Sequence, residues 1–183
     1  MLLGLNAGEK TLGWGSNGRP KIADLKNMTS TMSREVHRLS WELRPTALDD
    51  LGLETAIANY LERWGQRFNS NVEFAGNLQG RRLPASVEIT LYRVLQEAMT
   101  NIAKHARAER ISVVLEGETG EVRLIVEDDG IGFAQTNPSV SSIVTSGFGL
   151  IGIRERLALV GGSLMIESAC GHGTALFCRI PAS

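Results

Sequence analysis

The chain has 183 residues, with 19 Lys and Arg against 20 Asp and Glu, and its formal net charge at neutral pH is −1. This balance gives no overall field that would attract nucleic acid or an anionic membrane, and we expect direct contact with neither. The apolar runs are far shorter than the roughly 20 residues that span a bilayer, and no secretory signal peptide opens the chain. Two cysteines without C-x-x-C spacing argue against a zinc site or a disulfide framework. A reducing, cytoplasmic location is the simplest interpretation.

The first 45 residues differ in pattern from the rest. Residues 1–18 are glycine-rich and lack a hydrophobic period, which predicts a loop. From Lys21 onward, Met and Leu side chains recur at three- and four-residue steps, which predicts a helix that Pro45 ends at about Arg44. We therefore divide the chain into an N-terminal helical segment, 1–45, and a second domain, 46–183.

The second domain mixes helical and strand patterns. Helices are expected over 53–68, 84–107 and 149–160, and strands over 71–76, 111–117, 121–128, 163–169 and 174–181. A polar stretch, 134–148, precedes the last helix and is long enough for a lid or binding loop. Helices alternating with a mostly antiparallel sheet predict a two-layer α/β sandwich.

Near the C-terminus, "SGFGLIGIRERL" contains the pattern G-x-G-x-x-G in Gly147, Gly149 and Gly152. Glu167, twenty residues after Gly147, stands where a ribose-binding acid would be expected in a dinucleotide site. That fold needs a buried strand leading directly into the first glycine, and here a polar stretch precedes it. A dinucleotide-dependent redox protein therefore remains only a minor alternative.

A polar stripe follows the apolar face of the helix expected over 84–107. Glu97, Asn101 and His105 recur at i, i+4 and i+8, with Lys104 beside them. Because the stripe borders the apolar face, Asn101 and His105 are expected at the edge of the core, where a cleft could open. The simpler interpretation is a solvated helix flank with a satisfied histidine.

A second polar group ends the strand expected over 121–128. Val122, Leu124 and Val126 share one face of that strand, and Asp128 continues the same inward phase. A carboxylate entering the core side needs a hydrogen-bonding partner, such as the amine of a ligand. Gly130 and Gly132 follow and permit close backbone approach or positive φ. The simpler interpretation is an Asp-Asp-Gly turn that closes a strand.

Four motifs stand in a fixed order: E-x-x-x-N-x-x-K-H-A, D-D-G-x-G-F, G-x-G-L and G-H-G-T. In this order the chain resembles the ATP-binding catalytic domain of two-component sensor histidine kinases, in particular the nitrate-sensor type. The wider fold group includes gyrase, heat-shock chaperone and mismatch-repair ATPases, which implies a Bergerat-type ATP-binding fold. The stretch "RLSWELRPTALDDLGLETAI", residues 38–57, resembles the connector between the dimerisation helices and the ATPase domain. No G-x-x-x-x-G-K-[ST] occurs, which excludes a P-loop.

The resemblance implies binding of ATP with Mg²⁺ and transfer of the γ-phosphoryl group to a histidine. Asn101 would hold Mg²⁺, and Glu97 would act as a general base or orient the attacking group. Lys104 and His105 would face the phosphates. Asp128 would accept a hydrogen bond from the adenine amine. The other nucleotide-binding positions would be Gly130, Gly132, Gly147, Gly149, Leu150, Gly173 and Thr174, with Gly147 and Gly149 hinging a lid over the ATP.

One part of such a kinase is missing from this sequence. The family's phosphoacceptor histidine precedes an acidic residue, but His37, His105 and His172 are followed by other residue types. Residues 1–45 are therefore interpreted as the remnant of a dimerisation module, and the acceptor is expected outside this chain. The implied partners are a response regulator with a helix-turn-helix output domain and a second copy in a full-length homodimer. The alternative is a nucleotide-binding regulatory module of anti-sigma type without kinase activity.

Overall fold

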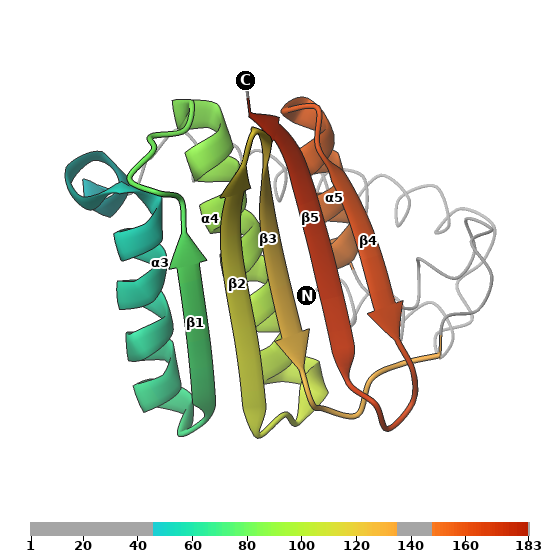
Figure 1. The fold of residues 1–183 in the computed structure, drawn as a ribbon. Helices are drawn as coiled ribbons and strands as arrows, with labels where there is room; N and C mark the ends of the chain where they lie inside the picture. Colours follow the sequence, from blue (N-terminus) through green and yellow to red (C-terminus); the bar gives the residue numbers. More distant parts are fainter. Residues whose placement is uncertain (1–45, 135–147, 183) are drawn as a thin grey trace, which may run out of the picture. The chain divides into compact units, whose positions relative to one another are not determined.

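The computed structural model describes residues 46–134 and 148–182. The helix expected before Pro45, His37 and Gly147 lie outside the described residues, and the division of the chain at residue 45 stays a prediction. A five-stranded sheet carries helices on one face (Figure 1). The helices are α3 (Thr46–Phe68), α4 (Ala85–Asn101), the π-helical turn η1 (Ile102–Ala106) and α5 (Phe148–Leu159). The strands are β1 (Asn71–Asn77), β2 (Arg110–Glu118), β3 (Gly120–Asp128), β4 (Ser163–Ser168) and β5 (Thr174–Ala182).

The sheet has the strand order β1-β2-β3-β5-β4. Strands β1 and β2 pair in parallel, and the other neighbours pair antiparallel. A parallel pair needs a crossover connection, which α4 and η1 supply here. The two-layer sandwich with a mixed, mostly antiparallel sheet is therefore confirmed.

The core lies between the sheet and the three α-helices. Alternate residues of the strands point into it, among them Val113 and Leu115 of β2 and Leu124 of β3, all fully buried. Leu91 and Leu95 of α4 are fully buried against them. Burying one such leucine contributes roughly 1.5–3 kcal/mol, so α4 is held firmly on the sheet.

Helix α3 begins seven residues earlier than the predicted Leu53, and Gly52 interrupts it with φ 79° and ψ 168°. The first turn is held by a residue that is distant in sequence. Arg82 donates from Nη1 to Leu48 O over 3.0 Å and from Nη2 to Asp49 O over 2.8 Å. Because these carbonyls are satisfied from outside the helix, the local pattern did not reveal this turn.

Candidate functional site

Glu97 and Asn101 of α4 meet the first turn of α5. A β-carbon placed on Gly149 would lie 2.5 Å from Glu97 Oε1 and 3.1 Å from Asn101 Oδ1, so any larger residue there would displace the Glu97 carboxylate. Both polar side chains are half-buried, at the edge of the core. Leu150, the next residue of α5, is also half-buried and packs against the core.

The Asn101 amide has an atom without a protein partner. Its Nδ2 is buried and has no hydrogen-bond partner among the residues that the structure describes. Buried polar atoms in folded proteins nearly always have a partner, and the two ends of an amide are not distinguished by coordinates alone. An atom of this side chain is therefore available to a polar ligand.

The end of this helix differs from the prediction. The α-helical geometry expected through residue 107 gives way at Ile102 to the π-turn η1, and Arg107 follows with φ 54°. In a π-turn the hydrogen bonds run from i to i+5, so the i, i+4, i+8 stripe does not continue past Asn101. His105 is exposed rather than at the edge of the core.

Lys104 is also exposed. It lines a groove of about 510 Å³ between α3 and the end of α4. The groove is also lined by Tyr60, Arg63, Trp64, Arg67, Phe68, Thr100 and Ala103. The structure thus does not bring Lys104 beside Glu97, and the phosphate-facing roles of Lys104 and His105 stay predictions.

Asp128 ends β3 as a half-buried carboxylate. Its Oδ1 accepts a hydrogen bond from Gly130 N over 2.9 Å, and the backbone N–H of Thr174 also donates to the carboxylate. Burial raises the pKa of Asp128 above the ordinary value, against the lowering effect of these hydrogen bonds. Asp128 therefore points toward the core side of β3 and is partly shielded from water. A ligand amine would be an effective hydrogen-bonding partner for it there.

Asp129 has a different role from its neighbour. This exposed residue accepts hydrogen bonds at Oδ1 from the backbone N–H groups of Glu109, over 2.9 Å, and Arg110, over 3.0 Å. Its Oδ2 pairs with Arg110 Nε at 3.3 Å. These donors lower the pKa of Asp129, and the hydrogen bond from the backbone N–H of Arg110 has the largest effect. An amide oxygen at this position could accept the same two backbone bonds.

Glycine is required at three positions around Asp128, because neighbouring backbone segments come too close to leave room for a β-carbon. A β-carbon on Gly130 would lie 2.2 Å from Ala106 O, and one on Gly132, at φ 56°, would lie 2.1 Å from Ala169 O. A β-carbon on Gly173, at φ 75°, would lie 1.9 Å from Asp128 O. The loop after β3 is thus clamped between η1 and the β4–β5 turn. Direct contact of Gly130 and Gly132 with a base stays a prediction.

Ser168, at the end of β4, was not predicted from the sequence. Its Oγ donates to Gly173 O over 2.9 Å, accepts from Phe133 N over 2.9 Å and lies 3.0 Å from Thr174 Oγ1. One hydroxyl therefore fixes the loop after β3, the β4–β5 turn and the Thr174 side chain. Nothing in the local pattern distinguishes this serine from any other at a strand end.

Arg156 of α5 was also missed. Its half-buried side chain has a lowered pKa, chiefly because of burial, while the nearby charge of Glu97 acts in the opposite direction. Arg156 comes seven residues after Gly149, which puts both on one face of the helix. That spacing is the sequence signal that could have identified it. The site thus contains a guanidinium close to Glu97.

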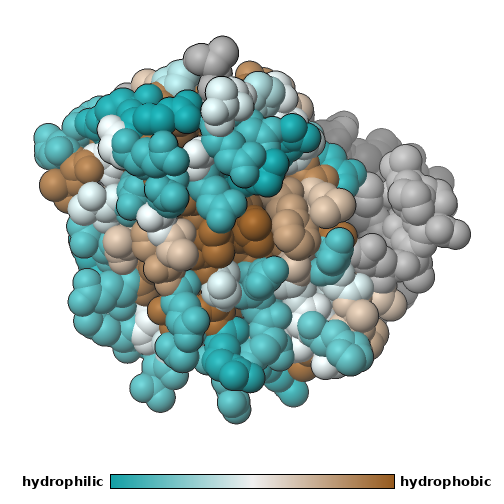
Figure 2. Space-filling view, viewed as in Figure 1, coloured by the Kyte–Doolittle hydropathy of each residue, from teal (hydrophilic) through white to brown (hydrophobic). Residues whose placement is uncertain are grey.

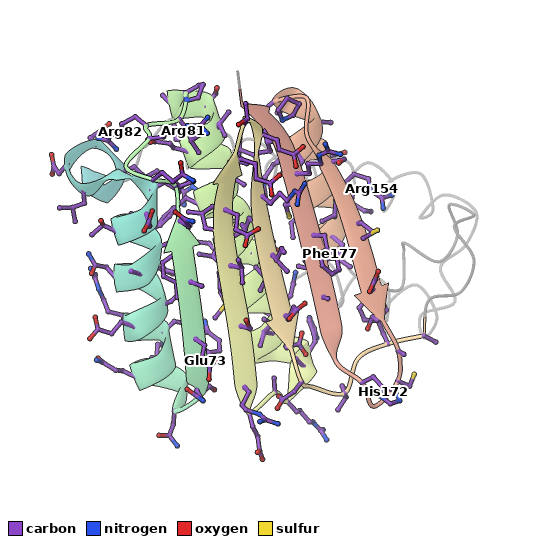
Figure 3. All side chains as sticks on the ribbon, viewed as in Figure 1. Glu73, Arg81, Arg82, Arg154, His172 and Phe177 are labelled. Carbon is purple, nitrogen blue, oxygen red and sulfur yellow. The ribbon has the colours of Figure 1, made fainter. Side chains whose placement is uncertain are left out.

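The remaining histidine with a described position is His172. It is exposed in the β4–β5 turn (Figure 3). Its backbone N–H donates to Ala169 O over 3.0 Å. This turn carries Gly173 and so supports the backbone beside Asp128.

These side chains fit a nucleotide with a magnesium ion. Mg²⁺ takes oxygen ligands and is usually held by one or two protein groups together with substrate phosphates and water. The Asn101 amide oxygen, together with phosphate oxygens and water, matches this donor set. Within 46–134 and 148–182 there is no group of three His, Cys, Asp or Glu side chains that would hold a metal alone. Over the same ranges, no helix has the length and apolar character needed to cross a bilayer.

Comparison with known proteins gives consistent matches. Residues 86–183 match the family described as histidine kinase-, DNA gyrase B-, and HSP90-like ATPase. The chain is 35% identical over 161 residues to the signal transduction histidine-protein kinase/phosphatase DegS of Brevibacillus brevis, covering 88% of this chain and 40% of that protein. It is 33% identical over 163 residues to the oxygen sensor histidine kinase NreB of Staphylococcus carnosus, covering 87% of this chain and 46% of that protein. The chain thus spans less than half the length of these relatives.

A solved structure has the same fold. The histidine kinase domain of the Erythrobacter litoralis blue-light activated histidine kinase superposes with a TM-score of 0.59 at 18% identity, covering 70% of this chain and 60% of that one. At this identity the likeness shows the fold alone. It supports the ATPase-type arrangement of sheet and helices described above.

Proposed function

Because the chain belongs to the family of histidine kinase-, DNA gyrase B- and HSP90-like ATPases, we propose that it is the catalytic part of a two-component sensor histidine kinase. It binds ATP with Mg²⁺ and transfers the γ-phosphoryl group to a histidine. The observation that carries the proposal is the buried, unpartnered amide atom of Asn101 beside Glu97 and the first turn of α5. Buried side-chain polar atoms in folded proteins nearly always have a partner, so this amide supports a polar ligand at the site.

At the adenine end, Asp128 binds and orients the base. Its carboxylate accepts a hydrogen bond from the exocyclic amine, and its partial burial strengthens that bond because water competes less. The Ser168 hydroxyl holds Thr174 and the β4–β5 turn in place beside it. Gly130, Gly132 and Gly173 let the backbone segments beside Asp128 pack closely, since a β-carbon on any of them would collide with neighbouring backbone.

At the phosphate end, Asn101 supplies an oxygen ligand to Mg²⁺, which neutralises phosphate charge when bound. Glu97 accepts a proton from, or orients, the attacking group. Arg156, Lys104 and His105 add positive charge or hydrogen-bond donors near the phosphates. Gly147 and Gly149 let the preceding segment move as a lid, and Leu150 anchors the start of α5.

The acceptor histidine belongs to a segment outside this chain, since none of the three histidines precedes an acidic residue. The next partner is a response regulator with a helix-turn-helix output domain, and the full-length kinase is a homodimer. We also propose a cytoplasmic location, as befits the cytosolic portion of a sensor kinase. The names of the two relatives, both histidine kinases, support a response regulator as partner and a dimeric kinase.

Calorimetric titration of the chain with ATP, with and without Mg²⁺, tests the binding step. We expect Mg²⁺-dependent binding that Asp128→Asn weakens at least about tenfold, or about 1.4 kcal/mol, and Asn101→Ala should remove the Mg²⁺ dependence. Glu127→Gln is the matched control, because Glu127 is the exposed neighbour of Asp128 on the other face of β3. If both site variants bound like the parent chain, the site would be wrong.

Transfer is tested by adding a separate acceptor helix pair from a relative and following radiolabel from γ-labelled ATP. Labelling that Glu97→Gln slows without weakening ATP binding supports the kinase. Normal ATP binding with no labelling would favour a regulatory module of anti-sigma type. Binding of NAD in preference to ATP would favour a dinucleotide protein instead.

A further inference from the structure

The outer face of the sheet, opposite the helices, carries a row of apolar side chains with one residue from every strand. The register aligns neighbours directly: Ala75 with Val114, Val114 with Ile125, Ile125 with Phe177, and Phe177 with Met165. We call these five residues the apolar row. Figure 2 shows apolar surface gathered over the middle of this face, and Figure 3 places Phe177 there.

The apolar row is exposed to solvent. Met165 has 55% of its surface exposed, Ala75 is also exposed, and Val114, Ile125 and Phe177 are half-buried. An antiparallel sheet with one face on the core normally presents polar residues on the other face. A contiguous apolar band across five strands instead marks an interaction surface.

Two polar rows flank the apolar row. On the side toward Asp128 lies the acidic row of Glu73, Ser112, Glu127, Ala175 and Glu167. On the other side lies the arginine row of Asn77, Glu116, Arg123, Arg179 and Ser163. The two flanks therefore differ in charge on the central strands. On β3, for example, Glu127 lies on one side of the apolar row and Arg123 on the other.

The cations of the arginine row are held in place. The Glu121 carboxylate accepts from Arg123 Nη2 over 2.5 Å and also pairs with Arg179. A guanidinium has five N–H donors, so both arginines keep donors for a further partner. Within the described residues, no cation lies within 4.0 Å of the carboxylates of Glu127 and Glu167, which leaves the acidic row open to one.

We propose that this face pairs with the same face of a second copy of the chain, about a two-fold axis parallel to the apolar row. Such an axis keeps each strand opposite its own counterpart and reverses its direction. The apolar row then covers its copy, and the arginine row faces the acidic row. Arg123 lies opposite the partner's Glu127, and the contact occurs twice because the interface is isologous.

Charge selects this axis over the alternative. A two-fold axis parallel to the strands, centred on β3, would set Arg123 and Glu127 each against its own copy. It would also set Glu73 against the partner's Glu167 twice, and these four like-charge contacts exceed the two opposite-charge contacts between Glu116 and Arg179. Opposed like charges are unfavourable in such an interface. Two sheets facing each other about 10 Å apart can bury the apolar row in the usual way of a β-sandwich.

The pairing leaves the candidate nucleotide site open, because α4 and α5 lie on the other face of the sheet (Figure 1). It is independent of the proposed kinase function. Variants of the outer face should therefore change association without changing ATP affinity, which separates a failure of this proposal from a failure of the proposed function.

Sedimentation velocity of the full chain over a wide range of concentrations tests the pairing. Phe177→Asp should weaken one association step at least about tenfold. Leu159→Asp is the control, because Leu159 is an exposed apolar residue at the end of α5, 82% exposed, away from this face. Residues 1–45 are predicted to carry a second pairing surface. The informative quantity is therefore the difference in association between the parent chain and the variant.

A charge exchange tests the axis. Glu127→Arg and Arg123→Glu each place like charges in opposition and should weaken association. An equimolar mixture of these two variants restores both cross-pairs and should associate like the parent, an outcome that a folding defect cannot produce. Phe177→Asp that sediments like the parent would overturn the pairing, and a mixture that associates no better than either variant would overturn the axis.

Discussion

Gly149 lies against Glu97: a β-carbon added to Gly149 would stand 2.5 Å from Glu97 Oε1. The first turn of α5 is thereby placed directly on the polar side chains of α4. Farther along α5, Ile153 and Leu157 are fully buried and fix the helix on the core. The close approach of α5 to Glu97 thus depends on the absence of a side chain at Gly149.

Gly149→Ala should displace Glu97 and also crowd Asn101, whose Oδ1 would lie 3.1 Å from the added carbon. Because Asn101 is the proposed Mg²⁺ ligand, Mg-ATP affinity should fall about tenfold. Gly152→Ala is the matched control in the same helix, because its β-carbon would meet only the Arg156 guanidinium, at 3.6 Å. That second substitution should stabilise the fold by up to about 1 kcal/mol, since alanine favours a helix over glycine. Calorimetry with ATP and thermal unfolding check both effects. Equal ATP affinities in the two variants would contradict the contact.

Gly173→Ala should destabilise the fold and abolish ATP binding. The added β-carbon would lie 1.9 Å from Asp128 O and force β5 away from the end of β3. Gly171→Ala provides the control: its φ of 78° is nearly that of Gly173, at 75°, but nothing lies within 4 Å of the added atom. It should cost only the left-handed backbone strain of roughly 1–2 kcal/mol. Denaturant unfolding of both variants separates the backbone strain from the collision with Asp128 O. Similar losses of unfolding free energy in the two variants would show that the collision is unimportant.

Local periodicity was sufficient to predict the elements that carry the site. The alternation of Val122, Leu124 and Val126 predicted the inward phase that leaves Asp128 half-buried at the end of β3. Glu97 and Asn101, four residues apart, lie together on α4 because α-helical geometry holds up to Asn101. The two-layer fold followed from the same patterns, since both elements bury one face.

Interactions between distant residues were not predictable in this way. The π-turn η1 is stabilised by backbone contacts, such as Ala106 O with Ile131 N at 2.8 Å, that only the folded chain creates. Arg82 caps the first turn of α3 from 34 residues away. The apolar row likewise depends on the register of all five strands, and the period of any single strand does not reveal it.

The two cysteines should differ strongly in reactivity. Cys178 is 1% exposed, and burial raises its pKa to about 12, whereas Cys170 is exposed in the β4–β5 turn. The thiolate is the reactive form, so a native chain should react rapidly with one equivalent of a disulfide reagent and with a second only on unfolding. Cys170→Ser should remove the rapid phase. Two equal rapid phases in the native parent would contradict the burial of Cys178.

ATP affinity should depend on pH through Asp128. Burial raises the pKa of this carboxyl, and only the ionised form accepts a hydrogen bond at both oxygens. Affinity should therefore begin to fall, as the solution is acidified, at a higher pH than an ordinary aspartate would give. Titrations of parent and Glu127→Gln at a series of pH values should agree, since Glu127 lies on the other face of the sheet. A pH-independent affinity in the parent would rule Asp128 out as the acceptor.

The same shift predicts a gain in stability for Asp128→Asn. When the folded state raises the pKa of an acid, it holds more protons than the unfolded state between the two pKa values, so the free energy of unfolding decreases as pH rises through that window. The loss persists at neutral pH, where the half-buried carboxylate is ionised beside Asp129. An amide removes the charge and still accepts from Gly130 N. Thermal unfolding at neutral pH should show a higher midpoint for the variant and a smaller difference in acid. A higher midpoint together with weaker ATP binding in this variant would indicate that the carboxylate serves the proposed nucleotide site at a cost in stability.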